Sequence, residues 1–403
     1  MTMQRVGNGS SRAARRSAAV AASGAMSLLA QAITPVFAGP AEQAERLYER
    51  LAGAQPSASV LAEMTNDITS QPGQAGLLAA AAVATDPTKA PTFYNVVLKN
   101  WAMPWTNRNQ TVFAPFNDYA ATVIGMVRDN VPFNTVLSAD ILYTVNSSGL
   151  PAVANNNNNH YATAEANGVD LSSTLVATTQ SAAYGIPTAA TAGVITSYGG
   201  ASAFFINGTN RAMFRFTMIN HMCNDMPTLM DTSRPTDRIR QDVARNPGGD
   251  SRIFLNNCVG CHSGMDPMAQ AFAYYNFDVT SNQLVYTQGQ TQAKYHINTT
   301  NFPQGFVTPD DSWSNRWRQG PNSVLGWGSG PGSGNGAKSW GQEIAGSQQF
   351  AACQVQKVFQ AVCFRNPASQ ADINAAAAIT ASFQQGYNLK TVFQQVAATC
   401  PGT

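Results

Sequence analysis

The segment SQQFAACQVQKVFQAVCF, residues 347–364, decides the fold class of this chain. Its apolar residues recur at the spacing of an α-helix, and five of them share one face: Ala351, Val355, Val358, Phe359 and Val362. A helix with one apolar face buries that face against other elements. The segment therefore predicts an amphipathic helix inside an α-helical unit.

Helical patterns continue on both sides of this segment. Ser369 and Asp372 form a capping-box pattern for a helix that is expected to end at Gly386, and NLKTVFQQVAATC predicts the last helix. Upstream, helices are expected in AEQAERLYERLAG, SASVLAEMTNDI, FNDYAATVIGMVRDN, FNTVLSADILYTV and NRAMFRFTMINHM. We therefore expect a mainly α protein.

Changes in composition indicate how the chain is organised. Residues 147–207 contain five consecutive asparagines and are rich in Thr, Ala, Ser and Gly, which is typical of an irregular insertion with short strands. The Gly-rich segment GWGSGPGSGNG predicts a flexible linker. The expected regions are a signal peptide at 1–38, a helical N-terminal domain at 39–146, the insertion at 147–207, a motif-bearing region at 208–325, the linker at 326–339 and a C-terminal three-helix unit at 340–403.

The N-terminal segment has the pattern of an export signal. Residues 1–38 hold four of the 24 basic residues and no acidic one, and an apolar run ends in Val36-Phe37-Ala38. A membrane anchor is the alternative, although polar residues interrupt the run. Removal of the segment leaves a near-neutral chain, which argues against nucleic acid binding, and no later stretch predicts a transmembrane span. We expect a periplasmic, secreted or cell-surface protein.

Two of the six cysteines and one of the four histidines form the motif Cys258-x-x-Cys261-His262. This motif attaches haem covalently through two thioethers, and its histidine ligates the iron on the proximal side. A zinc site needs a second Cys/His pair, and a redox Cys-x-x-Cys usually lies in a βαβ context; the sequence contains neither pattern. One haem c per chain is therefore expected, and residues 208–325 are the expected cytochrome c-like haem region.

The other four cysteines are expected to form two disulfides in an oxidising compartment. Cys353 and Cys363 lie ~15 Å apart if one helix carries both, and bridged Cα atoms lie within ~7 Å. Up-down-up packing of the last three helices favours Cys363–Cys400, which leaves Cys223–Cys353. Free buried thiols are the alternative.

The second axial ligand of the iron stays open at this stage. Met226 is a distal candidate because it precedes a proline in INHMCNDMP, where His221 and Met222 also occur. His296 is an alternative, Met103 is a reserve, and an open coordination position is the remaining hypothesis.

Arginines bracket the motif and are candidate partners of the haem propionates. Arg215 and Arg252 are the two residues that we select for this role. His160, next to the asparagine tract, is expected at the surface. Asp310 and Asp311 are expected in a turn or cap rather than in a catalytic pair.

The segment CVGCHSGMDPMAQAFAYYNFD, residues 258–278, resembles the planctomycete-type cytochrome c proteins, whose domains are mostly of unknown function. The C-terminal helical pattern is similar to that family as well, whereas the Gly-x-x-Arg that usually follows Phe-Asp is absent. The resemblance implies a secreted or cell-surface monohaem cytochrome and gives no substrate. The positions that carry it are Cys258, Cys261, His262, Asp266, Pro267, Phe277 and Asp278.

Three functional hypotheses follow from these features. The first is one-electron transfer by an exported monohaem c-type cytochrome, with a redox partner protein or a small electron donor or acceptor. The second is a haem enzyme with an open distal site that acts on peroxide, oxygen or a small ligand. The third is a cell-surface structural or binding protein in which haem is a folding element. The electron carrier is favoured over an enzyme with its own substrate.

Overall fold

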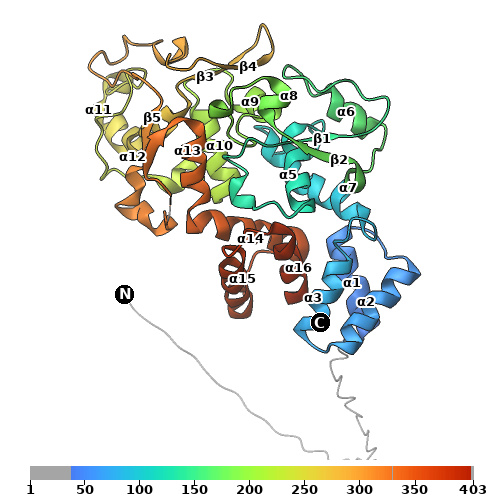
Figure 1. Ribbon diagram of the computed structural model, residues 1–403. Coiled ribbons are helices and arrows are strands. Elements are labelled where there is room, and N and C mark those ends of the chain that lie inside the picture. The colour runs from blue at the N-terminus through green and yellow to red at the C-terminus, as the bar shows by residue number, and fades with distance from the viewer. Residues whose placement is uncertain (1–37, 329, 401–403) are drawn as a thin grey trace, which may run out of the picture. The chain divides into compact units, whose positions relative to one another are not determined.

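The helix predicted from residues 347–364 is α14, Gln348–Cys363, and it crosses the middle of the molecule in Figure 1. The side chain of Ser347 caps its first turn by accepting a hydrogen bond from the backbone N–H of Phe350. The five apolar residues of the predicted face are all buried. The prediction of this helix is therefore confirmed.

The computed structural model describes residues 38–328 and 330–400. Helices dominate this part of the chain, and its strands pair into two-stranded antiparallel sheets. The mainly α fold class is therefore confirmed. The predicted signal peptide lies outside the described residues, except for Ala38. The region boundaries predicted at 146, 207 and 325 fall within a single compact unit, Ala38–Thr403.

The N-terminal helices pack against the C-terminal helix of the chain (Figure 1). They are α1 Pro40–Ala52, α2 Ala58–Ser70 and α3 Gln74–Val83, and both α1 and α3 contact α16, Leu389–Thr399. Gly53 ends α1 in the left-handed conformation that glycine adopts readily. The rings of Phe93 and Phe393 meet edge to face at 5.2 Å and extend this contact.

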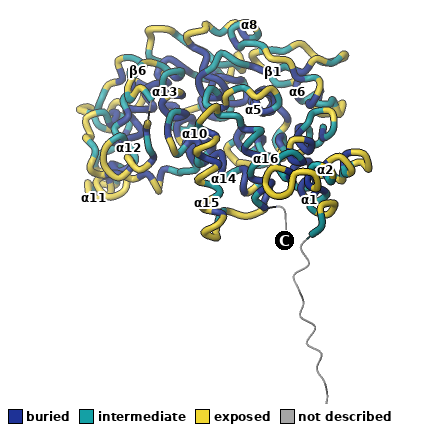
Figure 2. The backbone as a smooth tube through the Cα atoms, turned by 60° about the horizontal axis from the view of Figure 1, so that its bottom comes forward, coloured by how far each residue is buried: buried dark blue, intermediate teal, exposed yellow. Residues whose placement is uncertain are grey.

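A run of short helical turns leads from this contact into the core. It consists of the π-helical turn η1 Phe93–Leu98, α4 Lys99–Ala102 and the 3₁₀ turn η2 Met103–Thr106. The helix α5, Asp118–Arg128, follows, and it is buried on all sides from Asp118 to Val127. Figure 2 shows the buried stretches running through α5, α10 and α14, whereas α11 is exposed.

The prediction of a helix in FNTVLSADILYTV, residues 133–145, is wrong. The segment forms the 3₁₀ turn η3 Phe133–Thr135 and then the strand β1 Leu142–Val145, which pairs antiparallel with β2 Leu175–Thr178. The end of the segment, ILYTV, is rich in β-branched and aromatic residues, which suit a strand. The strand forms because it pairs with β2, about thirty residues later in the sequence. Nothing in residues 133–145 themselves predicts that partner.

The segment expected as an irregular insertion is built into the core. It contains α6 Asn159–Ala166, α7 Leu171–Thr174, α8 Gln180–Tyr184, η4 Thr188–Ala190 and α9 Tyr198–Phe204. The fully buried carboxylate of Asp118 accepts backbone N–H bonds from Tyr198 at 2.6 Å and Gly199 at 2.8 Å, which fixes α9 to α5. His160 is buried as well, so its predicted surface position is wrong. Its two ring nitrogens bond to the backbone of Val145 and Pro151.

The second half of the chain begins with α10, Arg211–Met222. The elements that follow are η5 Met226–Leu229, η6 Pro247–Gly249, α11 Ser251–Ile253, η7 Phe254–Cys258, α12 Val259–Ala269, η8 Gln270–Phe272, the hairpin β3 Tyr275–Asp278 and β4 Gln283–Tyr286, and η9 Ala293–Tyr295. The helices α10 and α12 contact each other, so the predicted haem region forms one side of the same core.

The segment predicted as a flexible linker, 326–339, is packed against its neighbours. The elements around it are β5 Ser312–Ser314, η10 Arg316–Arg318, η11 Pro321–Leu325, β6 Ser333–Asn335 and α13 Gly336–Ala345. The carboxylate of Glu343 has no exposed surface, and it accepts bonds from Arg318 at 2.8 Å and from the N–H of Gly332 at 2.9 Å. Trp327 is buried and donates to the carbonyl of Trp317. These contacts hold the Gly-rich backbone in place.

The C-terminal helices are tied to the rest by the two predicted disulfides. Cys363–Cys400 joins α14 to the end of α16, and Cys223–Cys353 joins α10 to α14. The capping box of Ser369 and Asp372 begins α15, Gln370–Phe383, as predicted.

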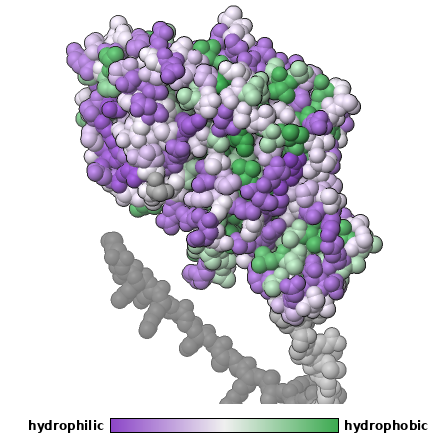
Figure 3. All heavy atoms as spheres, in the orientation of Figure 1, coloured by the Kyte–Doolittle hydropathy of each residue, from purple (hydrophilic) through white to green (hydrophobic). Residues whose placement is uncertain are grey.

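Apolar residues are scattered over the face of the molecule that Figure 3 shows. Within the described residues, no helix has the length and apolar character that crossing a membrane requires.

Candidate functional site

The motif Cys258-x-x-Cys261-His262 lies at the junction of the π-helical turn η7 with the helix α12. Asp250 begins this segment by capping the short helix α11 through the N–H of Arg252. Cys258 and Cys261 are half-buried and lie outside the two disulfides. Because residues three apart share a helix face, both thiols lie on the same side of α12.

The helix α12 lies directly against the indole of Trp317. An added Cβ at Gly264 would come within 2.0 Å of the Trp317 ring nitrogen. Only glycine permits this approach, and Trp317 is fully buried there. The helix that carries the motif therefore packs closely on the core through a residue that lies far from it in sequence.

His262 is oriented by a buried carboxylate on its own helix. Nδ1 of His262 lies 3.1 Å from Oδ2 of Asp266, one turn later, and the His262 side chain is 20% exposed. Burial raises the pKa of Asp266, but the positive charges of Arg211 and Arg240 outweigh this effect and hold it well below its usual value. Asp266 is therefore an ionised acceptor next to the imidazole.

Two arginines bind this carboxylate from other elements. Arg211, at the start of α10, donates to both oxygens of Asp266 at 2.7 and 2.9 Å and pairs with Asp242 at 2.6 and 2.9 Å. Arg240 lies 3.4 Å from Asp266. Two arginines and two aspartates balance each other in charge. Because Nδ1 of His262 is engaged by Asp266, Nε2 is the ring nitrogen that remains for a metal.

Three exposed apolar side chains belong to the segments that carry or contact the motif. Met230, Ile253 and Leu255 are 41, 41 and 56% exposed. Met230 lies against Gly260 between the two cysteines, and Cys258 packs on a small buried cluster that includes Phe254. A planar apolar group attached to the two thiols would cover part of this exposed surface.

The distal candidates lie in different environments. The carbonyl oxygen of Met226 is 3.6 Å from Sγ of Cys261, and the Met226 side chain is buried against the main core. His296 is exposed and follows the turn η9. Of these two predicted candidates, Met226 is thus the one that directly contacts the motif.

The other methionines and the histidine considered for the iron are parts of the core. Met103 and Met222 are buried. His221 has no exposed surface, and its Nε2 lies 2.8 Å from the hydroxyl of Tyr119. These three side chains pack inside the molecule rather than around the motif.

The two arginines predicted as propionate partners lie in exposed ion pairs. Arg215 pairs with Asp225 at 2.6 Å, and Arg252 pairs with Asp250 at 2.7 Å. Neither is among the arginines that bind Asp266. Arg211 and Asp242 were not predicted as site residues. They lie 55 and 24 residues before Asp266 in the sequence, so no local pattern links them to it.

The residues at this site fit a covalently attached haem. Two thiols share one helix face, a histidine follows with Nδ1 engaged and Nε2 free, and apolar side chains flank them. Within residues 38–328 and 330–400, no group of three or more His, Cys, Asp and Glu side chains is arranged to hold a metal ion by itself. No family model, curated protein or solved structure matches this chain.

Proposed function

We propose that this chain is an exported monohaem c-type cytochrome, of the planctomycete type, that transfers single electrons. Cys258 and Cys261 would hold haem through thioethers, and His262 would be the proximal ligand. When bound, haem supplies a one-electron couple between ferric and ferrous iron. The partner would be a redox protein or a small electron donor or acceptor.

The observation that carries this proposal is how the six cysteines are divided. Four of them form two disulfides that join distant elements, which is typical of a protein in an oxidising compartment. The two motif cysteines lie outside these disulfides, Cys258 at the end of η7 and Cys261 in the first turn of α12, where His262 follows. A cytochrome c needs these two thiols and this histidine for haem attachment.

The residues around His262 have a role that follows from their contacts. Asp266 accepts a hydrogen bond from Nδ1–H of His262 and sets the orientation of the ring, and Arg211 and Arg240 hold the carboxylate in place. A carboxylate partner raises the basicity of a ligating histidine. Trp317 packs against Gly264 of α12, the helix that carries both His262 and Asp266.

Intact mass of the exported protein tests haem attachment. Produced in a host able to attach haem c, the protein should gain the mass of one haem and keep it after denaturation. The double variant Cys258→Ala/Cys261→Ala should be exported with both disulfides and without this mass. Recovery of the unmodified chain from the competent host would overturn the proposal.

The second candidate function, a haem enzyme with an open distal site, is favoured by Asp266. A basic proximal histidine stabilises the more oxidised states of iron, which chemistry with peroxide or oxygen requires. The visible spectrum of the resting protein separates the two functions. A low-spin spectrum that cyanide leaves unchanged supports the electron carrier, whereas a high-spin ferric spectrum that shifts rapidly with cyanide or peroxide supports the enzyme.

A further inference from the structure

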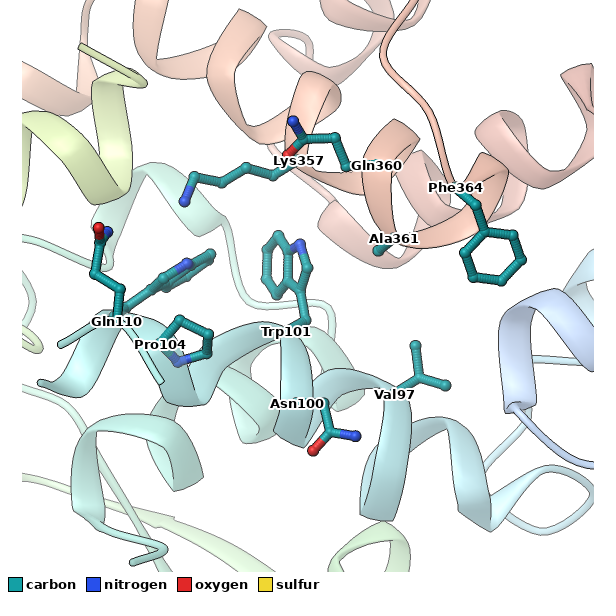
Figure 4. A pocket seen from close by; sticks show the side chains of 10 residues that line it. Val97, Asn100, Trp101, Pro104, Gln110, Lys357, Gln360, Ala361 and Phe364 are labelled. Atoms are coloured by element: carbon teal, nitrogen blue, oxygen red, sulfur yellow. The ribbon is translucent and has the colours of Figure 1, made fainter. Parts of the chain in front are cut away.

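One cavity is lined by residues that are distant in sequence from the haem motif. It lies between the turns η1, α4 and η2 on one side and α14 on the other (Figure 4). Its volume is about 510 Å³, which suits a small organic ligand. No acidic residue lines it. The lining is therefore compatible with a negatively charged ligand.

Two tryptophans supply the apolar wall of this cavity. The rings of Trp101 and Trp105 lie 4.4 Å apart and meet at 62°. Trp105 is only 2% exposed, whereas Trp101 is partly exposed. An aromatic ligand would cover the exposed part of the Trp101 ring.

Lys357 extends from α14 across the cavity (Figure 4). Its Nζ lies 4.8 Å from the centroid of the Trp105 ring, and among the described residues no carboxylate pairs with it. Burial lowers the pKa of Lys357 to about 8, so the ammonium is charged at neutral pH but weakly solvated. A partly desolvated cation without a counter-ion is a favourable site for a carboxylate.

Neutral amides complete the polar part of the cavity. Asn100, Gln110 and Gln360 line it, and Figure 4 shows them on different sides of the tryptophans. Amides hydrogen-bond a ligand without adding charge. The phenyl ring of Phe364 is 75% exposed and stands at the rim, where a ligand would cover it.

We propose that this cavity binds an aromatic monocarboxylate, with its ring against Trp101 and its carboxylate next to Nζ of Lys357. The cavity shares no residue with the haem motif, so this inference does not depend on the proposed function.

Calorimetric titration of the purified full chain tests the proposal with a matched pair of probes, 2-naphthoate and 2-naphthamide. They have the same ring and differ in charge. The naphthoate should bind at least about tenfold more tightly than the amide, because only its carboxylate forms a charge-assisted hydrogen bond with the Lys357 ammonium. Equal affinities, or no binding of the naphthoate, would overturn the proposal.

Two substitutions at the cavity locate the charge. Lys357→Met should reduce the affinity for naphthoate to that for the amide, whereas Lys338→Met, on α13 outside the cavity, should leave both affinities unchanged. Gln360→Glu adds a negative charge at an exposed position and should weaken only the naphthoate. An unchanged naphthoate affinity in Lys357→Met would show that the lysine is not the anion partner. Covalent haem content, measured on the same samples, should be equal in all variants.

Discussion

Asp266 lies one helical turn after His262, and its carboxylate is 3.1 Å from Nδ1 of that histidine. The same carboxylate is bound by Arg211 and lies within 3.4 Å of Arg240. Three elements, α10, the segment before α11, and α12, therefore meet at one buried anion. The orientation of the histidine and the stability of this side of the core depend on the same group.

Replacement of Asp266 by asparagine should destabilise the protein strongly. Asp266→Asn leaves the charges of Arg211 and Arg240 without their shared counter-ion, and loss of one partner of a buried ion pair costs about 3–5 kcal/mol. Asp242→Asn is the matched control, because Arg211 then keeps its bonds to Asp266. Urea unfolding of both variants should show the larger loss for Asp266→Asn. Equal losses would mean that Asp266 is not the centre of the cluster.

The close contact of α12 with Trp317 predicts a difference between two glycines of the same helix. Gly264→Ala should push the buried indole aside and destabilise the protein by about 1–3 kcal/mol, because the new Cβ would lie 2.0 Å from the ring nitrogen. At Gly260 the new Cβ would lie 3.2 Å from Cβ and 3.3 Å from Cε of Met230, so a small shift suffices and the cost should be much smaller. Thermal unfolding measures both. A similar shift in the two variants would argue against the tight α12 contact.

Local sequence patterns predicted the helices whose ends carry clear capping residues. Ser347 begins α14, Gly53 ends α1, and the capping box at Ser369 begins α15, because each depends on residues within one turn. The strand β1 and the burial of His160 were missed because their partners come from other parts of the chain. Composition was misleading at 326–339, where a buried glutamate from α13 orders the Gly-rich backbone.

At the candidate site too, the sequence predicted the local pattern and missed the groups that come from distant segments. The spacing of Cys258, Cys261 and His262 is a local pattern, and these residues lie at the end of η7 and in the first turn of α12. The groups that orient His262 are different, because Arg211 and Arg240 approach from other segments. Asp266 was visible in the sequence only as part of a family resemblance, and its contact with His262 required the helix register.

The two disulfides should contribute unequally to stability. In the chain-entropy model, a bridge stabilises more when it closes a longer loop. Cys223–Cys353 spans 130 residues and Cys363–Cys400 spans 37. Replacement of both cysteines of a bridge by alanine should cost about 2–5 kcal/mol, with the larger loss for Cys223–Cys353. Denaturant midpoints under non-reducing conditions measure this, and the opposite ranking would show that native-state strain dominates.

His221 should make the protein less stable in mild acid. Burial, together with the positive charge of Lys357, lowers the pKa of His221 to about 3, whereas an unfolded histidine titrates near 6.5. Between these values the unfolded chain binds a proton that the folded chain does not. The contribution of His221 is therefore fully present above pH 6.5 and is lost as the pH falls towards 3, by about 1.4 kcal/mol per pH unit.

Unfolding by urea at pH 7, 6, 5 and 4 tests this dependence. The titratable groups that face His221 keep their protons across this range: burial raises the pKa of Tyr119, and that of Lys357 is about 8. His221→Gln should lower stability at pH 7 and flatten the loss between pH 6.5 and 4, since glutamine does not titrate. If the variant and the parent chain lost stability in parallel over this range, another group would be responsible for the acid sensitivity.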